Sequence, residues 1–347
     1  MERPSQRLIA KRLGISVASV SLGLRGTGNV SKKLSEEIRA VAEEMGYRPN
    51  PLLASLGAKQ YRDNNVIGGA PIVALSLMRG PTYDRFLEER AKELGYNLSI
   101  IRPADLYQYA NLTNTLANRG VEGLVVAGRF PSSRTLNEFE WDKFSIVKCG
   151  GDTDALPFNA VGPNILASCI SAFRKAKTLG YRRIGFAIGK LDQITEHDFV
   201  RFLAATGLSN LEADEPERVP PYTDHRQDHK ALIGWFRKHR PDCVVGFHAG
   251  LCWALLEAGI KIPEEVGFAS LHTFEGNCLR DPLELSVAGM NQNWKEIARQ
   301  SINQLDQQIR YHLKGFTDNP NEVLIPSYWQ DGDTLPQKGS KESEPSQ

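Results

Sequence analysis

No apolar run in this chain approaches the roughly 18 residues that a membrane-spanning helix needs. The opening residues, MERPSQRLIAKR, also lack the apolar stretch that a secretory signal peptide carries. We therefore expect a cytoplasmic protein without a membrane partner, which argues against a secreted binding protein.

Cysteine is scarce, odd in number and without the CxxC spacing of redox or zinc sites. Reduced thiols in an intracellular protein are the expected state. His225 and His229 are spaced so that they could share one helix face as metal ligands, but the polar segment around them offers no third ligand. We expect a surface loop or a first helical turn there, and no metal. The cysteines are Cys149, Cys169, Cys243, Cys252 and Cys278.

Enzyme motifs are missing as well, since the chain has no GxGxxG and no GxSxG. Residues 185–190, GFAIGK, are one residue short of a P-loop, and Leu191 stands where a Ser or Thr would hold magnesium. Asp152 and Asp154 follow a predicted strand, as the paired aspartates of phosphatases do. Leu156, however, replaces the Thr or Val expected two positions beyond the second Asp. We therefore expect an ordinary polar turn there, no catalysis and no cofactor.

The formal net charge is only +1, but it is unevenly distributed. Residues 1–62 hold 11 Lys and Arg against 5 Asp and Glu, a net charge of +6, and the rest of the chain holds 31 against 36, a net charge of −5. A basic segment joined to an acidic one suits a part that meets nucleic-acid phosphates and a part that does not. A solvated charged face is the alternative interpretation.

The basic segment has the pattern of three short helices, each with a serine before it and a glycine at its end. Apolar residues recur at helical spacing within each, as Val20 and Leu24 do in the second. The first two helices are separated only by the tight turn 13–16, which predicts a helix-turn-helix whose second helix enters the DNA major groove. The capping serines are Ser5, Ser16 and Ser31, and the terminating glycines are Gly14, Gly26 and Gly46.

The same segment resembles the DNA-binding head of the lactose/galactose repressor (LacI/GalR) family. The likeness lies in GISVASVS, NVS and AVAEEMGYRPNPLLASL and covers the segment without a gap. It implies an all-α helix-turn-helix head over 1–48. A short hinge helix would follow Pro51, and with its linker it would span 49–70. An isolated helix that short is marginal in water and should fold only against a symmetry mate and DNA.

From Pro71 the chain alternates between short apolar strands and amphipathic helices, which predicts an α/β body with doubly wound parallel sheets. The body resembles the family's two-lobed effector domain, which has the periplasmic-binding-protein fold, in ANRGVEGLVVAG, KTLGYRRIGFA, EAGIKIPEEVGFASL and YWQDGDTL. The resemblance implies one effector and dimerisation domain over 71–332, in which the chain crosses between the lobes three times. Lobe one would hold about 71–158 and 287–315, and lobe two about 159–286 and 316–332. Residues 333–347 are almost entirely polar and are expected to form a disordered tail.

For the head, Val17 and Ala18 open the helix whose side chains meet base edges, where apolar groups can touch a thymine methyl. Leu22 stands where the family commonly has Arg, so it either faces DNA or belongs to the core, and Arg25 is expected to supply part of the polar contact. Ser16, Ser19, Ser21, Asn29 and Ser31 suit phosphate contacts or caps, although Ser19 and Ser21 also fit an ordinary helix surface. Tyr47 and Asn50 complete the set of DNA-binding residues.

Leu56 matches the family's hinge-helix leucine, which wedges between base pairs in the minor groove and kinks the DNA. Ala54 replaces an Arg often found in the family. The alternative is that Leu52, Leu53 and Leu56 pack against the body, because apolar residues at helical spacing usually mark a core.

Effector contacts are expected in the loops at the carboxyl ends of the strands, where open α/β sheets bind ligands. The family often has Asn-Asp where Phe247-His248 stands, which suggests a ligand other than its commonest sugars. The expected effector-binding residues are Arg79, Tyr83, Asp84, Arg129, Phe130 and Asp152 in lobe one, Arg201, His248 and His272 in lobe two, and Gln292 at a crossover.

The resemblance implies a homodimeric, sequence-specific transcription regulator, with repression the favoured role. Its partners would be a pseudo-palindromic operator DNA and a small, carbohydrate-like effector bound between the lobes. Two rival interpretations remain: an enzyme on the same scaffold with an appended DNA-binding head, and a stand-alone solute-binding protein. The missing catalytic motifs argue against the first, and the basic head argues against the second.

Overall fold

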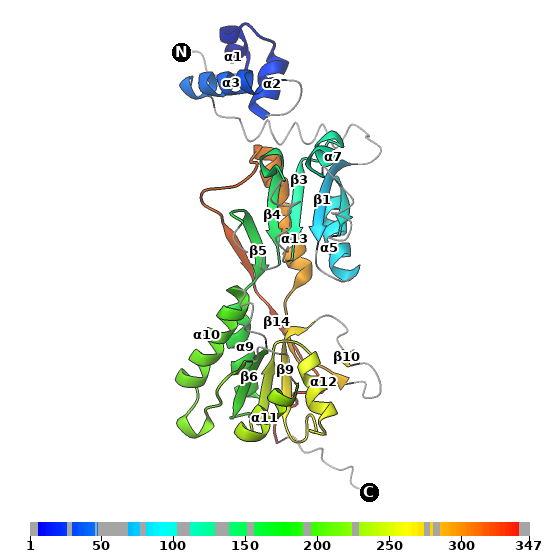
Figure 1. Ribbon diagram of the computed structural model, residues 1–347, viewed down its shortest axis with the longest axis vertical. Coiled ribbons are helices and arrows are strands. Elements are labelled where there is room, and N and C mark those ends of the chain that lie inside the picture. Colours follow the sequence, from blue (N-terminus) through cyan, green and yellow to red (C-terminus); the bar gives the residue numbers. More distant parts are fainter. Residues whose placement is uncertain are drawn as a thin grey trace.

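Figure 1 shows the computed structural model, in which a small helical head is followed by two α/β lobes arranged along one axis. The described residues are 6–25, 30–45, 47, 69–76, 81–102, 112–128, 139–150, 156–189, 196–223, 229–273, 278–279 and 285–339. Within these ranges, no helix has both the length and the apolar character needed to cross a bilayer.

The head consists of α1 (Gln6–Leu13), α2 (Val17–Arg25) and α3 (Lys32–Glu44). The predicted caps at two of the three helices are confirmed. Ser16 Oγ accepts from the backbone N–H of Ser19 at 2.9 Å, and Ser31 Oγ accepts from the N–H of Leu34 at 3.3 Å. Gly14 ends α1 with φ +66°, a left-handed conformation that glycine adopts without strain. Ser5, Gly26 and Gly46 lie outside the described residues.

The apolar stripes of the three head helices meet in one small core of fully buried side chains. Gly23 of α2 lies against α3 so closely that a Cβ there would come 2.4 Å from Cδ1 of Ile38. This close approach fixes how α2 packs across α3 and leaves the opposite face of α2 toward solvent. The buried core residues are Ile9, Ala10, Val20, Ile38 and Ala42.

Lobe one is a six-stranded, all-parallel sheet in the order β13-β5-β4-β3-β1-β2. Helices α5 and α13 cover one face of the sheet, and α7 with the short 3-10 helix η1 packs on the other. The central strands are buried on both faces, as the continuous apolar runs in the sequence predicted. The elements are β1 (Ala70–Ser76), α5 (Pro81–Glu93), β2 (Tyr96–Ile101), α7 (Leu112–Asn118), β3 (Gly123–Ala127), η1 (Trp141–Lys143), β4 (Ser145–Cys149), β5 (Asn159–Pro163), α13 (Trp294–Tyr311) and β13 (Glu322–Ile325).

Lobe two repeats this architecture with the strand order β14-β12-β9-β8-β6-β7. Only β14 runs antiparallel, at the edge beside β12. Helices α9 and α10 cover one face, and α11 and α12 the other. The elements are α9 (Ile165–Thr178), β6 (Ile184–Gly189), α10 (Glu196–Leu211), η2 (Glu215–Glu217), β7 (Tyr222–Thr223), α11 (His229–His239), β8 (Cys243–Gly246), α12 (Gly250–Glu257), β9 (Gly267–Thr273), β10 (Cys278–Leu279), β11 (Leu285–Ser286), β12 (Gly289–Asn291) and β14 (Tyr328–Gln330). The strands β10 and β11 form a separate two-stranded hairpin.

The chain crosses between the lobes three times, as expected, but the predicted boundaries were wrong. Strands β5 and β13 pair with each other in the sheet of lobe one, although residues 159–163 and 322–325 were assigned to lobe two. Strand β12 pairs with β9 in lobe two, although residues 289–291 were assigned to lobe one. The reason is that strands this short carry no signal for one sheet or the other in their own residues, because each lies next to a crossover and its pairing is set by the packing of the whole lobe.

The C-terminal segment corrects a second expectation. Residues 333–339 are described and lie against lobe two rather than forming a disordered tail. Thr334 is fully buried, and its Oγ1 donates to the carbonyl of Phe268 at 2.8 Å and accepts from the N–H of Ala288 at 3.0 Å. Leu335 is 4% exposed and belongs to the core of the lobe. The composition of this segment did not predict an ordered structure, because only two of its side chains are buried.

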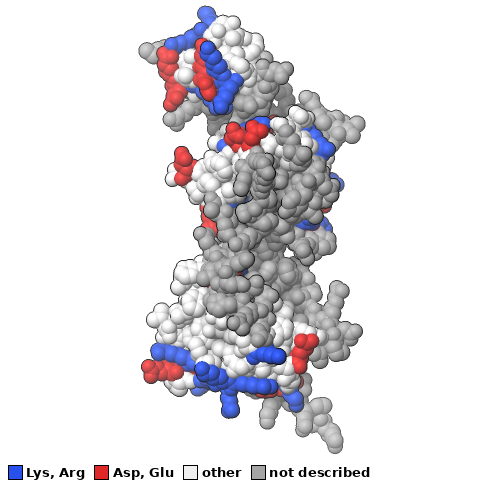
Figure 2. Space-filling view, viewed as in Figure 1, with Lys and Arg blue, Asp and Glu red and all other residues white. Residues whose placement is uncertain are grey.

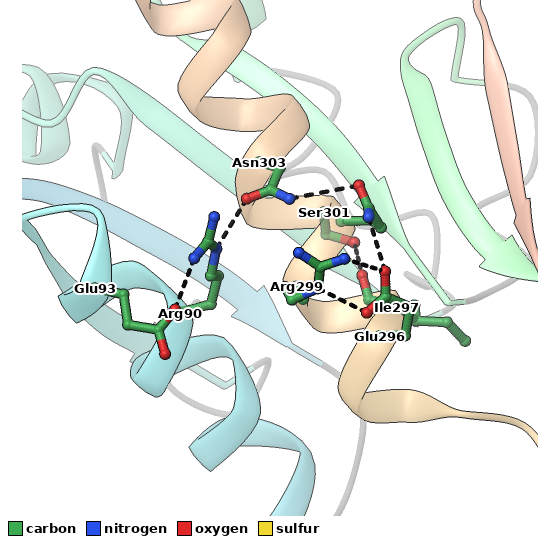
Figure 3. A network of polar contacts seen from close by, with 8 residues as sticks. Arg90, Glu93, Glu296, Ile297, Arg299, Ser301 and Asn303 are labelled. Carbon is green, nitrogen blue, oxygen red and sulfur yellow. Dashed lines mark hydrogen bonds and ion pairs between the residues drawn. The ribbon is translucent and has the colours of Figure 1, made fainter.

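Helix α13 returns from lobe two and runs the length of lobe one beside α5. Figure 3 shows the polar contacts that fix it. Arg90 on α5 donates to Oδ1 of Asn303 on α13 at 2.8 Å and to Glu93 at 2.7 Å, and Arg299 forms a two-point contact with Glu296, both bonds at 2.6 Å. The Arg90–Asn303 bond joins α13 to α5, whereas the Arg299–Glu296 contact lies within α13 and the Arg90–Glu93 contact within α5.

Candidate DNA-contacting helix and interlobe site

The second helix of the head presents its first residue to solvent. Val17 is 42% exposed, whereas Val20, one turn further along, is fully buried in the head core. Ser16 is exposed, and besides capping the helix its Oγ lies 2.8 Å from the hydroxyl of Ser19, which is half-buried. An exposed helix N-terminus with an apolar first residue and hydroxyls beside it can meet base edges and phosphates together.

The structure describes the remaining DNA-contacting candidates only in part. Leu22 is half-buried and is not among the described residues that form the head core. Tyr47 packs on that core, and its N–H donates to the carbonyl of Ala42 at 2.8 Å. Ser31 is exposed and caps α3. Ala18, Ser21 and Arg25 belong to α2, but their side chains lie outside the description, as do Asn29, Asn50 and Leu56 altogether.

The charges of the head and body are more mixed on the surface than the net charges of the two segments indicate. Figure 2 shows Lys and Arg beside Asp and Glu on the visible face of the head, and a band of Lys and Arg across the end of lobe two away from it. Arg12 and Glu44 form an ion pair on the head at 2.5 Å, although both side chains are largely exposed. Exposed ion pairs of this kind contribute little to stability. The net charge of +6 therefore describes the long-range electrostatic field of residues 1–62 rather than a uniformly basic surface.

Lobe two brings an arginine, two histidines and a phenylalanine together at the carboxyl ends of β8 and β9. The guanidinium of Arg201 lies over the ring of Phe247 at 4.3 Å and donates to Asp198 at 2.8 Å. Phe247 in turn lies 5.5 Å from the ring of His248 and 6.2 Å from that of His272. Arg201 is only 5% exposed, and the half-buried Asp198 is an ion-pair partner for its charge.

This cluster reaches lobe one through Trp294, the first residue of α13. Its indole Nε1–H donates to Nε2 of His272 at 3.3 Å, with the ring centroids 5.8 Å apart. On its other side Trp294 meets the edge of Tyr83 at 5.5 Å, and a Cβ on Gly150 would come 2.3 Å from Cζ3 of the indole. One side chain therefore contacts strand ends of both lobes.

Both histidines are held neutral. Burial lowers the pKa of His272 to about 4, with smaller contributions from the charges of Arg201 and His248. Burial also lowers the pKa of His248, followed by the charge of His229, and Nδ1 of His248 accepts from the N–H of Gly250 at 3.0 Å. The neutral state agrees with the role of His272 Nε2 as an acceptor, which an imidazolium cannot fill.

Lobe one places an ion pair at the carboxyl ends of β1 and β2. Arg102 pairs with Asp84 and also donates to the hydroxyl of Ser76 at 3.0 Å. Oδ1 of Asp84 is buried and has no hydrogen-bond partner among the described residues. Tyr83, next to it, is buried and bonded through its hydroxyl to Cys149. Of Tyr83 and Asp84, Asp84 is therefore better able to accept a hydrogen bond from a ligand hydroxyl or amine.

Other expected effector residues are partly outside the description. Gln292 is buried, and its amide donates to the carbonyl of Leu271 at 3.4 Å, so it fixes the crossover. Arg79, Arg129, Phe130 and Asp152 lie outside the described residues. The sequence interpretation missed Trp294, Asp198 and Arg102. An aromatic residue directly after the crossover was a signal for Trp294, and the spacing of three residues on a helix was a signal for the Asp198–Arg201 pair.

Comparison with known proteins shows which family combines such a head with such a body. Residues 8–50 match the family described as bacterial regulatory proteins, lacI family, and residues 82–332 match the periplasmic binding proteins and sugar binding domain of the LacI family. The chain belongs to the LacI family. It is thus a DNA-binding transcription regulator with a periplasmic-binding-protein-like effector domain, as the resemblance in the sequence implied.

Curated LacI-family relatives are distant but cover most of the chain. The HTH-type transcriptional regulator DegA of Bacillus subtilis is 24% identical over 74% of this chain and 78% of its own. The maltose regulon regulatory protein MalI of Escherichia coli is 27% identical over 72% and 75%, and the catabolite repressor/activator of the same species is 24% identical over 85% and 89%. These relatives are transcription regulators rather than enzymes.

Solved structures share the fold. The lac repressor dimer bound to operator and the anti-inducer ONPF has a TM-score of 0.56 at 16% identity, covering 96% of this chain and 100% of that one. The transcriptional regulator CelR–cellobiose complex has a TM-score of 0.55 at 16% identity, with the same coverage. A LacI-family regulator from Enterococcus faecium with bound ribose has a TM-score of 0.57 at 16% identity, covering 77% and 99%.

Proposed function

We propose that this LacI-family regulator is a homodimeric repressor whose affinity for a pseudo-palindromic operator is set by a small, carbohydrate-like molecule bound between the lobes. Residues 1–48 form the DNA-binding head, 49–70 the hinge and linker, and 71–339 the effector and dimerisation domain, whose last residues pack on lobe two. The DNA that the head contacts is bacterial chromosomal DNA, so the protein acts in the cytoplasm.

The observation that carries this proposal is the contact between His272 of lobe two and Trp294 of lobe one. A ligand that touches either ring changes how firmly the lobes hold together, and α13 transmits the change toward the head-facing end of lobe one. Such a ligand acts only through a difference in its affinity for the two lobe arrangements. The expected consequence is a change in how the two hinges meet and in the spacing of the heads.

The charges at the junction suit a neutral, polar ligand. Among the described residues at the junction, the strong cations Arg201 and Arg102 are each paired with a carboxylate, and the two histidines are neutral. Phe247 and Trp294 provide aromatic faces, while Oδ1 of Asp84 is an acceptor that no other described residue satisfies. A polyol ring has hydroxyls for the polar groups and C–H faces for the aromatic ones. Solved relatives carry cellobiose and ribose, which are ligands of this class.

Truncation tests the DNA-binding half of the proposal. Removing residues 1–60 should leave a folded body that no longer binds operator, because the removed segment is net positive and the remaining chain is net negative. The intact protein should lose affinity steeply as salt rises, since each phosphate contact releases counterions. Specific operator binding by the truncated body would overturn the assignment.

A thermal-shift screen of mono- and disaccharides and their metabolites tests the effector half, with each hit checked for chemical turnover. A binder that raises the melting temperature and is recovered unchanged supports a regulator. A ligand converted to product would instead favour the rival interpretation, an enzyme with an appended DNA-binding head. His272→Ala and Trp294→Ala should abolish the shift for true effectors.

A further inference from the structure

A second cavity lies at the far end of α13, away from the interlobe junction. It has a volume of about 150 Å³ and is walled on its apolar side by Ile146, Leu313 and Phe316. Ile146 is near the start of β4, whereas the junction lies beyond the other end of that strand. The 18 residues of α13 separate the two places by about 27 Å. The cavity is therefore distinct from the interlobe site.

Two hydrogen-bond donors that line this cavity have no partner among the described residues. Gln308 is 6% exposed; its Oε1 accepts from the N–H of Ile146 at 3.2 Å, and this contact leaves Nε2 buried and unpaired. Lys314 is half-buried and forms no ion pair or hydrogen bond with another described residue. Buried polar groups are normally satisfied, so the unpaired Nε2 of Gln308 indicates a missing acceptor at this cavity. The half-buried Lys314 is a second donor at the same place.

The surroundings of Lys314 favour an anion as that acceptor. Burial lowers the pKa of the Lys314 ammonium, and the charge of Arg39 on α3 of the head lowers it further, while Glu122 and Asp142 act in the opposite direction. Neither carboxylate forms an ion pair with Lys314, so the ammonium has lost part of its hydration without gaining a counter-charge in contact. A carboxylate on a ligand would supply that contact and also accept from Nε2 of Gln308.

The size of the cavity limits the ligand. A cavity of about 150 Å³ with apolar walls accommodates a molecule of roughly the size of benzene. Leu313 and Phe316 remain 55% and 53% exposed, so the apolar side is open toward solvent and admits a ligand without unfolding. The ring of Phe316 is held in place by stacking on Phe158 at 4.9 Å.

We propose that this cavity is a second small-molecule site, which binds a small organic monocarboxylate with its carboxylate at Lys314 and Gln308 and its apolar part against Leu313 and Phe316. The site belongs to lobe one alone and does not depend on the identity of the interlobe effector.

Benzoate is a suitable probe, with benzyl alcohol as a neutral probe of nearly the same shape. Saturation-transfer NMR on the full-length protein should show millimolar binding of benzoate. Lys314→Met should weaken benzoate roughly tenfold, because a hydrogen bond to a charged group is lost, and should leave benzyl alcohol unchanged. Lys295→Met is the matched control, since Lys295 is an exposed lysine in the first turn of α13, at the end of that helix away from the cavity.

A second variant keeps the test valid if the first one does not fold. Gln308→Glu retains an oxygen for the N–H of Ile146 and replaces the donor by a second acceptor, so it should repel benzoate while the melting temperature changes little. Equal benzoate binding by the wild type and both variants would overturn the proposal. So would a wild-type protein that binds benzoate no better than benzyl alcohol.

Discussion

The indole of Trp294 and the imidazole of His272 form a hydrogen bond of 3.3 Å that joins the first turn of α13 in lobe one to β9 in lobe two. Because the indole can only donate, His272 must accept, and it can do so only while neutral. The contact thus depends on an imidazole whose pKa is lowered to about 4, mainly by burial. This dependence makes lobe contact sensitive to acid, but only well below neutral pH.

The first prediction concerns that acid sensitivity. In the unfolded chain His272 takes up a proton near pH 6.5, whereas in the folded protein it does so only near pH 4. Its contribution to stability is therefore complete above pH 6.5 and is lost as the pH falls toward 4, to a total of at most about 3 kcal/mol. His272→Gln keeps an acceptor that does not titrate. The melting temperature of the wild type should fall faster than that of this variant between pH 6.5 and 4, and parallel curves would contradict the assignment.

The second prediction concerns Gly150, whose φ is +66° beneath the indole. Gly150→Ala should cost about 2–4 kcal/mol of unfolding free energy, from left-handed strain and from overpacking against a rigid ring. In a Trp294→Leu background the overpacking is relieved, and only about 1 kcal/mol should remain. Gly120→Ala is the control, since Gly120 also has positive φ, +72°, but faces open space. Urea unfolding of the wild type, the two single variants, the double variant and the control measures these costs, and equal costs in both backgrounds would show that the ring is not the obstacle.

The third prediction concerns the contact of α2 with α3. Gly23→Ala places a methyl 2.4 Å from Cδ1 of Ile38, so the head must repack at a cost of about 1–3 kcal/mol, and operator affinity should fall. Ile38→Val removes that carbon, and the double variant should recover most of the affinity. Gly207→Ala, in a helix of lobe two with nothing near the new methyl, serves as the control. Hydrogen exchange of the head together with operator titration would measure the effect, and failure of the rescue would refute it.

The fourth prediction concerns Val17, the exposed first residue of α2. Val17→Gln should change which operator sequence is preferred rather than weakening binding uniformly, because contacts to bases specify and contacts to phosphates position. Lys11→Gln changes an exposed residue of α1. It should instead weaken binding to all operator sequences by a similar factor, if it affects binding at all. Selection from random DNA provides the readout, and an unchanged consensus for the Val17 variant would mean that this residue does not face the bases.

The fifth prediction concerns the C-terminal segment. Deleting residues 333–347 removes buried Thr334 and Leu335 and should lower the unfolding free energy of lobe two by about 2–5 kcal/mol, the range for losing one large core side chain. Deleting only 340–347 keeps both residues and should change the melting temperature little. Equal melting temperatures for the two truncated proteins would show that the buried contacts do not stabilise the lobe.

Local features of this chain could be predicted because their causes are local. Ser16 and Ser31 cap their helices through hydroxyls that reach only three residues forward, and Gly14 ends α1 through its own φ. Apolar periodicity predicted the central strands of both sheets for the same reason. Helices α10 and α13 were not singled out from their pattern, although both are long.

What the sequence by itself determined was the succession of elements, the helix-turn-helix of the head and the LacI family of the whole, because capping, periodicity and motif spacing all act within a few residues. Only the tertiary structure decided which sheet the short strands β5, β12 and β13 join and which side chains meet at the lobe junction. Arg102, directly after β2, acquires Asp84 of α5 as its partner only through folding, and Trp294 meets His272 only at the crossover between the lobes, whereas the Asp198–Arg201 pair is local to α10. The physical reason is that strand pairing and side-chain contact across a crossover are set by packing of the whole body, which no single stretch of sequence contains.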